Sequence, residues 1–372
     1  MSLQHIKALD GIRFLAVTLV LLDHWSGDQL GFPAGYLGVC LFFVLSGYLI
    51  TRILLHAKSQ DDLHGRSYKK SLQRFFIRRT IRIFPLYYLT LLALWFLDVP
   101  AVREKMIWLV TYTTNVYMAA QATWIGSSDH LWSLAVEEQY YLFFPFLLFF
   151  IPQKRTGWIF PAFLLFSVGI RLYFYITGVS WIASYVLMFT CLDAFGLGGW
   201  LAYVQFHKSE TWLKRFRQPS TVLIALVLYL IVLYLGHQPD NPHNAWITVA
   251  LRLFESLLSV TMIGLIVEGM QRPSPLDRVR PILECTPIVF IGKISYGIYL
   301  FHNYVFNYYH TPPDHPVVKI VQKLGQYTHW FELSWWPGFF LYYAITVAMA
   351  TCSWYLIEQP INDLKRHFDY TS

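Results

Sequence analysis

The sequence predicts an all-α integral membrane protein, a polytopic bundle of about ten transmembrane helices with both termini on the cytoplasmic side. Three observations support this prediction. Of the 372 residues, 56% are hydrophobic and only 14% are charged, well below the quarter that is usual in soluble domains. The apolar residues are gathered in runs of membrane-crossing length. The basic residues cluster between these runs, which explains the net charge of +7 without a nucleic acid partner.

Ten apolar segments are counted as membrane spans. They run near residues 8–25, 36–55, 83–97, 131–151, 158–177, 182–204, 220–236, 246–268, 287–309 and 337–357. The first segment carries Asp10 and Arg13 and is followed by further spans, so it is a retained helix rather than a cleaved signal. No repeat and no second soluble domain is apparent. We therefore expect a single membrane domain over residues 1–372, without a fused extracytoplasmic domain.

The distribution of Lys and Arg predicts the orientation of the bundle. The loop 52–82 is the most basic part of the chain. Smaller basic clusters follow at residues 154–155, 208–217, 272–280 and 365–366. An even number of spans separates these clusters, so ten spans place all of them in the cytoplasm. The apolar piece 106–119 would break this parity if it crossed, and at 14 residues it is expected to be an interfacial or re-entrant helix.

Ionisable side chains within the first span are the first candidate functional residues, because their burial in lipid is costly. The segment 9–25, LDGIRFLAVTLVLLDHW, carries Arg13 near one end and His24 at the other. The two lie on nearly the same helix face, about 16 Å apart along the axis. The topology puts His24 at the outer end. Alternatively, Arg13 extends to the interface and His24 only caps the helix.

Further titratable residues fall in the extracytoplasmic half of the predicted bundle. Glu137 and Glu138 lie about two turns into the fourth span, and His302 lies in the outer half of the ninth. Others in the middle or outer part of their spans are Arg171, Asp193, Arg252 and Glu255. These acid and base groups would converge if the bundle closes. The alternative interpretation is a set of ion pairs between helices that satisfy one another.

The cytoplasmic side has a cluster of arginines, Arg78, Arg79 and Arg82, in the stretch RRTIRIFPLYY (78–88). They share one helical face, and guanidinium groups match phosphate oxygens in geometry and charge. A phosphate-rich donor could bind there with its reactive end reaching outward. The alternative is that these arginines only fix the topology.

Two local patterns add weaker candidates for contacts with substrate. Ser46 and Gly47 lie within a span in FFVLSGYL (42–49), where small residues allow helices to approach closely. A catalytic serine is less favoured there, because the sequence lacks a GxSxG context. Trp132 and Ser133 lie in a polar and aromatic stretch at the start of the fourth span. The four cysteines have no metal-ligand spacing, so no metal is expected.

Five stretches together resemble the acyltransferase family three of integral membrane proteins. They are LDGIRFLAVTLVLLDH (9–24), GVCLFFVLSGYLIT (38–51), RRTIRIFPLYY (78–88), LWSLAVEEQYYLFFP (131–145) and SYGIYLFH (295–302). The first contains Arg13 and His24 with ten residues between them. The resemblance covers nearly the whole chain. One departure lies in the sixth span, where the family often has an arginine shortly before an aspartate and this chain has Cys191 before Asp193.

The resemblance implies a membrane O-acyltransferase of the bacterial cytoplasmic (inner) membrane. Such enzymes move an acyl group, usually acetyl, from cytoplasmic acyl-CoA to a hydroxyl of an extracytoplasmic or lipid-linked glycan. Typical acceptors are O-antigen of lipopolysaccharide, exopolysaccharide and lipo-oligosaccharide, and some members acylate macrolides. A secondary transporter for a polar metabolite remains the alternative, although no inverted repeat is found.

Under this interpretation, His24 acts as general base on the acceptor hydroxyl or as a transient acyl carrier. Glu137 or Glu138 would orient it or provide a second proton-transfer group, with His302 as a further catalytic candidate. Residues expected to hold the CoA phosphates are Arg13, Arg78, Arg79 and Arg82. Expected substrate contacts are Ser46, Trp132 and Ser133.

Overall fold

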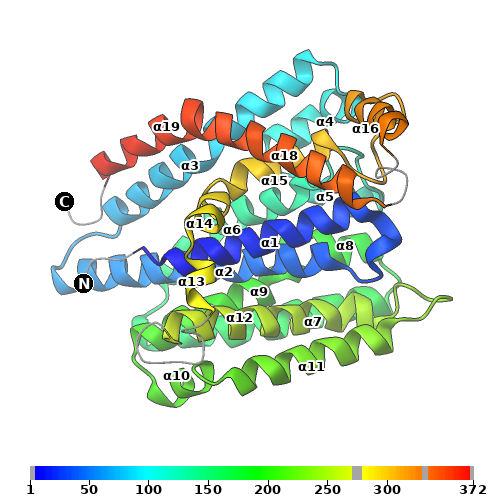
Figure 1. Ribbon diagram of the computed structural model, residues 1–372. Coiled ribbons are helices and arrows are strands. Elements are labelled where there is room, and N and C mark those ends of the chain that lie inside the picture. The colour runs from blue at the N-terminus through cyan, green and yellow to red at the C-terminus, as the bar shows by residue number, and fades with distance from the viewer. Residues whose placement is uncertain (1–4, 270–278, 329–333, 369–372) are drawn as a thin grey trace.

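The computed structural model describes residues 5–269, 279–328 and 334–368, and these ranges form helices and connecting turns without a strand. The long helices run side by side along one axis of the bundle (Figure 1). Helical stretches long and apolar enough to cross a membrane are Ala34–Leu63, Gln153–Ile176, Pro219–Gly236, Trp246–Gly269 and Trp336–Phe368. The prediction of an all-α membrane bundle is therefore confirmed, whereas the count of ten spans and the orientation remain predictions.

The centre of the bundle is formed by three helices, α1 (Lys7–Ser26), α2 (Ala34–Leu63) and α9 (Leu192–Phe206). Glycines let them approach closely. A Cβ atom at Gly47 would lie 2.1 Å from the Phe195 carbonyl oxygen, and one at Gly198 would lie 1.9 Å from the Val44 carbonyl oxygen. Only a hydrogen fits at these positions, so α2 and α9 are locked in register. The close packing expected around Ser46 and Gly47 is confirmed.

The remaining long helices surround this centre (Figure 1). They are α3 (Lys69–Phe96), α6 (Leu131–Phe150), α7 (Ile159–Ile176), α11 (Pro219–Gly236), α12 (Leu251–Gly269) and α18 (Trp336–Ser353). The predicted third span, 83–97, is the second half of α3, which begins at Lys69 and includes the arginine cluster. Pro85 lies inside α3 without ending it. A single rigid helix therefore carries both the arginines and the apolar segment.

Several predicted segments are interrupted. The sixth span divides into α8 (Trp181–Val186), η3 (Met188–Cys191) and α9, because the backbone is extended at Leu187. The ninth divides into α14 (Thr286–Lys293) and α15 (Ser295–Val305). The segment 106–119 is expected to form one helix, but it comprises parts of two, α4 (Pro100–Val110) and α5 (Thr114–Gln121). The chain is interrupted between them, where Tyr112 adopts a left-handed conformation with φ of 52°. Shorter elements are η1 (Gly27–Leu30), η2 (Gln153–Trp158), α10 (Glu210–Phe216), η4 (Trp246–Ala250), α13 (Arg280–Leu283), α16 (Pro316–Tyr327), η6 (Trp354–Glu358), α19 (Gln359–Asp363) and η7 (Leu364–Phe368).

Of the charged residues predicted in the fifth, sixth and eighth spans, Arg171 and Asp193 have a structural role. Arg171 of α7 forms a fully buried ion pair with Asp193 of α9, with Nη2 and Oδ2 2.6 Å apart. The Arg171 Nε atom also donates to the Val249 carbonyl, at 3.0 Å. The arginine that pairs with Asp193 thus comes from a neighbouring helix, and not from a position shortly before Asp193 in the chain. Arg252 donates to the Cys191 sulfur at 2.9 Å, and no ion pair joins it to Glu255 among the residues described.

Candidate active site

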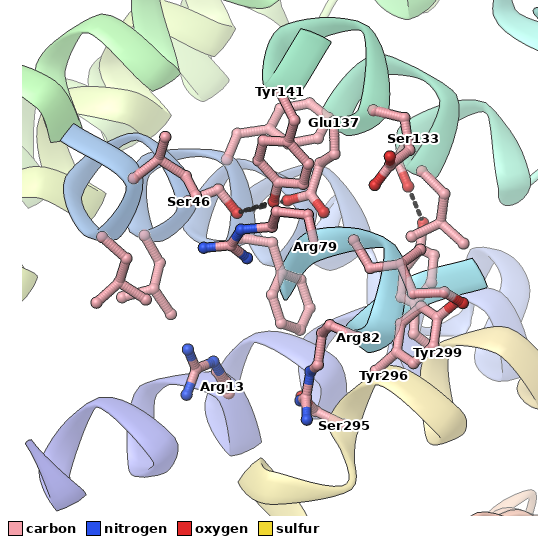
Figure 2. Close-up of a pocket in the computed structure, with 18 of the residues that line it drawn as sticks. Arg13, Ser46, Arg79, Arg82, Ser133, Glu137, Tyr141, Ser295, Tyr296 and Tyr299 are labelled. Atoms are coloured by element: carbon pink, nitrogen blue, oxygen red, sulfur yellow. Dashed lines mark hydrogen bonds between the residues drawn. The ribbon is translucent and has the colours of Figure 1, made fainter. Parts of the chain in front are cut away.

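A cavity between α1, α2, α3, α6 and α15 brings most of the predicted site residues together (Figure 2). Its empty space is about 920 Å³, counting the part that opens to solvent. Its charged and hydroxyl-bearing lining residues are Arg13, Ser46, Arg79, Arg82, Ser133, Glu137, Glu138, Tyr141, Ser295, Tyr296 and Tyr299. On α2 the lining runs from Val39 to Ile50, which corresponds to about 16 Å along the helix. We call this space the arginine cavity.

Three guanidinium groups reach the arginine cavity from two helices. Arg79 and Arg82 lie one turn apart on α3, and Arg13 comes from α1 (Figure 2). Arg79 lies over the ring of Tyr141, 5.1 Å from its centroid. Arg13 is paired with Asp10, which is 4% exposed. The three guanidinium groups are therefore placed to contact an anionic group that enters the cavity.

The fourth predicted arginine lies elsewhere. Arg78 Nη1 donates to the carbonyl oxygens of Lys365, at 3.0 Å, and Phe368, at 3.3 Å. Both acceptors belong to η7, near the end of the described chain. Arg78 is not among the residues that line the cavity. The structure therefore separates it from Arg79 and Arg82, with which the sequence had grouped it.

The two glutamates of α6 lie in the arginine cavity and not beside His24. The Ser46 hydroxyl donates to Glu137 Oε1 at 2.6 Å, and the Tyr141 hydroxyl donates to Ser46 Oγ at 3.0 Å (Figure 2). Glu138 Oε1 is buried and has no hydrogen-bond partner in the described part of the chain. The glutamates are thus placed to contact whatever fills the cavity. The structure does not bring them to His24 as the sequence suggested.

His24 instead meets His302, although 278 positions separate them in the chain. The Nδ1 atom of His24 lies 2.8 Å from His302 Nε2, and the two rings stack with centroids 5.0 Å apart. The His24 Nδ1 atom also lies 3.0 Å from Asn303 Oδ1. His302 is fully buried at the C-terminal part of α15. The structure therefore unites the two histidines that the sequence had predicted separately.

The hydrogen bonds around Asn303 fix the tautomer of His24. The backbone N–H of Tyr309 donates to Asn307 Oδ1, at 2.9 Å, so the Asn307 amide nitrogen faces the other way. That nitrogen donates to Asn303 Oδ1 at 3.0 Å, which makes this atom an acceptor. His24 Nδ1 must then carry a hydrogen and act as the donor. In neutral His24 the lone pair is left on Nε2, the atom that a general base uses.

The hydrogen bonds of His302 agree with this assignment. Its Nδ1 atom donates to the Tyr299 carbonyl oxygen, at 2.6 Å. In the neutral ring, Nε2 is then an acceptor and receives the hydrogen of His24 Nδ1. His302 thus orients His24 in the way that a buried acceptor orients a catalytic histidine.

Tyr299 connects the arginine cavity to the histidines. Its ring lines the cavity, and its hydroxyl lies 2.6 Å from Ser133 Oγ (Figure 2). The same hydroxyl donates to the His130 carbonyl at 3.0 Å. The imidazole of His130 packs against that of His302, with centroids 4.9 Å apart. One turn of α15 therefore separates the end of the cavity from the histidine pair.

Trp132, the remaining predicted substrate contact, packs inside the bundle. Its ring meets Phe43 edge to face at 5.9 Å and Tyr185 at 4.8 Å. It does not line the arginine cavity. Its neighbour Ser133 does line it, because successive helical residues point about 100° apart.

An ion pair between two loops lies near the same histidines. His310 Nε2 is 2.7 Å from Asp129 Oδ2, and both side chains are largely buried. The hydrogen bond to Asp129 raises the pKa of His310. The backbone N–H of Tyr308 donates to the His24 carbonyl at 2.9 Å, so the loop that carries His310 is anchored to α1.

The comparison with protein families agrees with this arrangement. A family model described as an acyltransferase domain matches residues 6–357. The chain belongs to acyltransferase family three. The resemblance recognised in the five sequence stretches is therefore confirmed.

Relatives of this family-three chain include two bacterial proteins. The chain is 28% identical over 383 residues to the peptidoglycan O-acetyltransferase OatA of Listeria monocytogenes. This match covers 97% of the chain and 56% of that protein. The chain is 27% identical over 391 residues to the O-acetyltransferase OatA of Staphylococcus aureus strain NCTC 8325, covering 97% and 58%. The chain thus spans less than two thirds of the length of these curated relatives. No solved structure matches it significantly.

Several residues of this family-three site were not predicted from the sequence. They include His130, Tyr299 and Asn303. Asn303 follows His302 directly and is an uncharged polar residue within a span, which is a detectable signal. His130 lies in a loop, and Tyr299 is one of many aromatic residues, so neither stands out without the fold.

Proposed function

We propose that this chain transfers an acyl group, acetyl in the simplest case, from acyl-CoA to a hydroxyl of a glycan. The single observation that carries the proposal is the adjacency of two chemically different sites. One is a cavity with three guanidinium groups, and the other is a histidine pair with a defined proton acceptor. Family membership and the names of the relatives support acyl transfer as the reaction.

The donor would occupy the arginine cavity. Arg13, Arg79 and Arg82 would bind the CoA phosphates, each through charge-assisted hydrogen bonds. The pantetheine arm would then extend along α2 toward Tyr299. Glu138 Oε1, a buried acceptor without a partner in the described residues, would accept an amide N–H of that arm. Arg78 would act indirectly, by holding η7 in place.

The histidine pair would perform the proton transfers. His24 Nε2 removes the proton of the acceptor hydroxyl as its oxygen attacks the thioester carbonyl. The tetrahedral intermediate then collapses, the C–S bond breaks, and the leaving sulfur takes the proton from His24 as CoA thiol. His302 Nε2 accepts a hydrogen bond from His24 Nδ1–H throughout, which stabilises the positively charged imidazolium.

The acceptor would approach from the side of the membrane opposite to the donor. The start of α1 and the end of η7 lie at the same end of the bundle (Figure 1), and the predicted topology puts that end in the cytoplasm. His24 lies at the other end of α1. We therefore propose an extracytoplasmic or lipid-linked glycan as the acceptor, in a bacterial cytoplasmic membrane.

Replacement of the general base tests this function. We expect His24→Ala to reduce acetyl transfer to the glycan by at least about 100-fold, because general-base catalysis contributes factors of that order. The measurement is acetyl ester formation on the glycan, with insertion and thermal stability recorded in parallel. The matched control is His64→Ala, an exposed histidine whose Nδ1 atom lies 2.8 Å from the Gln60 carbonyl oxygen. Normal acetylation by His24→Ala, or transport of a metabolite without acylation, would overturn the proposal.

A further inference from the structure

A second cavity lies near the start of α2, which packs against the end of α1, and it has no part in the proposed chemistry. It is enclosed by α2, α8, η4, α12 and the loop before η4. Its empty space is about 370 Å³, counting the part open to solvent. We call it the aromatic cavity.

Stacked rings form the mouth of the aromatic cavity. Trp181 and His243 are parallel, with centroids 4.1 Å apart and an interplanar angle of 12°. Tyr36 and Tyr185 pack against each other at 4.5 Å. All four residues line the cavity, and His243 is exposed. Flat aromatic faces of this kind bind the apolar C–H face of a pyranose ring, which has polar groups around its edge.

Polar atoms without partners lie deeper in the aromatic cavity. Glu255 Oε1 and Ser184 Oγ are buried and have no hydrogen-bond partner in the described part of the chain. Both residues line the cavity, together with Arg252, which donates to the Tyr185 carbonyl at 2.8 Å. Buried polar atoms are costly unless they are satisfied, so these atoms predict a ligand that supplies hydroxyl or amide groups.

The position of the aromatic cavity connects it to the reaction. Tyr36 lines it near the start of α2, and the residue before it, Gly35, packs against α1. A Cβ atom at Gly35 would lie 2.7 Å from Asp23 Oδ2. Asp23 directly precedes His24. The aromatic cavity therefore begins close to Asp23, the residue next to the proposed general base in the chain.

We propose that the aromatic cavity is an acceptor subsite, which binds one pyranose ring of the glycan. His243, stacked on Trp181 and exposed, offers its outer face to the ring, while Ser184, Glu255 and Arg252 bind its hydroxyl or amide groups. The neighbouring sugar then presents its hydroxyl to His24. This inference rests on the proposed function for its role in the reaction, but binding to the subsite needs no donor.

The test measures glycan binding by the purified full chain in lipid nanodiscs, without acyl-CoA. The probe is a tetrasaccharide of alternating N-acetylglucosamine and N-acetylmuramic acid, and the method is calorimetric titration. We expect His243→Ala and Glu255→Gln each to raise the dissociation constant about threefold to tenfold. The matched control is His207→Ala, because His207 is also exposed and packs on the ring of Tyr203, with centroids 4.1 Å apart, in a different part of the bundle.

The outcomes separate this inference from the proposed function. The subsite is refuted if the wild-type chain does not bind the tetrasaccharide, or if both variants bind it as tightly as the wild type. A chain that binds with the expected pattern and transfers no acetyl group contradicts only the proposed function. A chain that acetylates the glycan with an unchanged acceptor KM after both substitutions contradicts only the subsite.

Discussion

At the scale of residues, the protonation pattern of the histidine pair depends on the side chains and backbone groups around it. The tautomer of His24 follows from a chain of amide contacts that begins at the Tyr309 backbone and passes through Asn307 and Asn303. The sequence identified His24 and His302 because each is titratable in an apolar segment. It did not identify Asn303, because an uncharged amide in a span is a weaker signal of function than a titratable group. The role of a residue in a network depends on contacts that only the fold creates.

The arginines give the first prediction at this scale. Arg82→Gln should raise the apparent KM for acetyl-CoA roughly tenfold or more, because a charge-assisted hydrogen bond contributes about 1.5–3 kcal/mol. Arg78→Gln should change it much less, because Arg78 contacts η7 and does not line the cavity. Donor kinetics of the two variants provide the measurement. Equal effects on KM would show that both bind the donor, as the sequence alone had suggested.

The pair of His310 and Asp129 gives a pH-dependent prediction. Because Asp129 raises the pKa of His310, the pair stabilises the folded chain below the ordinary histidine value of 6.5. This contribution is lost as the pH rises through the raised value. His310→Gln should therefore lower stability by about 1 kcal/mol near pH 5.5 and by little near pH 9. Thermal unfolding at both pH values tests it, and an equal loss at the two would contradict the ion pair.

At the scale of elements, apolar run length identified most long helices but not their continuity. The runs predicted α1, α2, α6, α7, α11, α12 and α18. Hydropathy identifies only the part of a helix that is apolar enough to lie in the membrane. It therefore missed that α3 begins at Lys69, well before the apolar run. It also missed the extended residue Leu187 inside the sixth span. Such interruptions depend on backbone torsion angles, which the packing of neighbouring elements decides.

The crossing of α2 and α9 gives the prediction at this scale. Gly198→Ala should lower stability by about 1–3 kcal/mol, because its Cβ would lie 1.9 Å from the Val44 carbonyl oxygen and force the helices apart. The matched control is Gly169→Ala in α7, where no atom lies within 4 Å of the added methyl group. Thermal unfolding in detergent measures both. A similar midpoint for the two variants would show that the contact between α2 and α9 is not rigid.

At the scale of the whole molecule, the two sites lie one after the other along the bundle. The arginine cavity extends from Arg13 toward Tyr299, and the histidine pair follows it at the C-terminal end of α1. The spacing of Arg13 and His24 in the sequence already predicted this separation of about 16 Å. It did not predict that the glutamates join the arginines, because the pairing of α6 with α2 and α3 is a property of the closed bundle.

We propose that an acyl group passes from a donor on one side of the membrane to an acceptor on the other. The most direct test uses sealed vesicles in which the purified chain has the cytoplasmic end outward and the probe tetrasaccharide is enclosed. Labelled acetyl-CoA is added outside only, and acetyl esters on the enclosed glycan are measured. We expect esters to accumulate inside with the wild-type chain and not with His24→Ala. Esters that form only when donor and glycan share one side would contradict it.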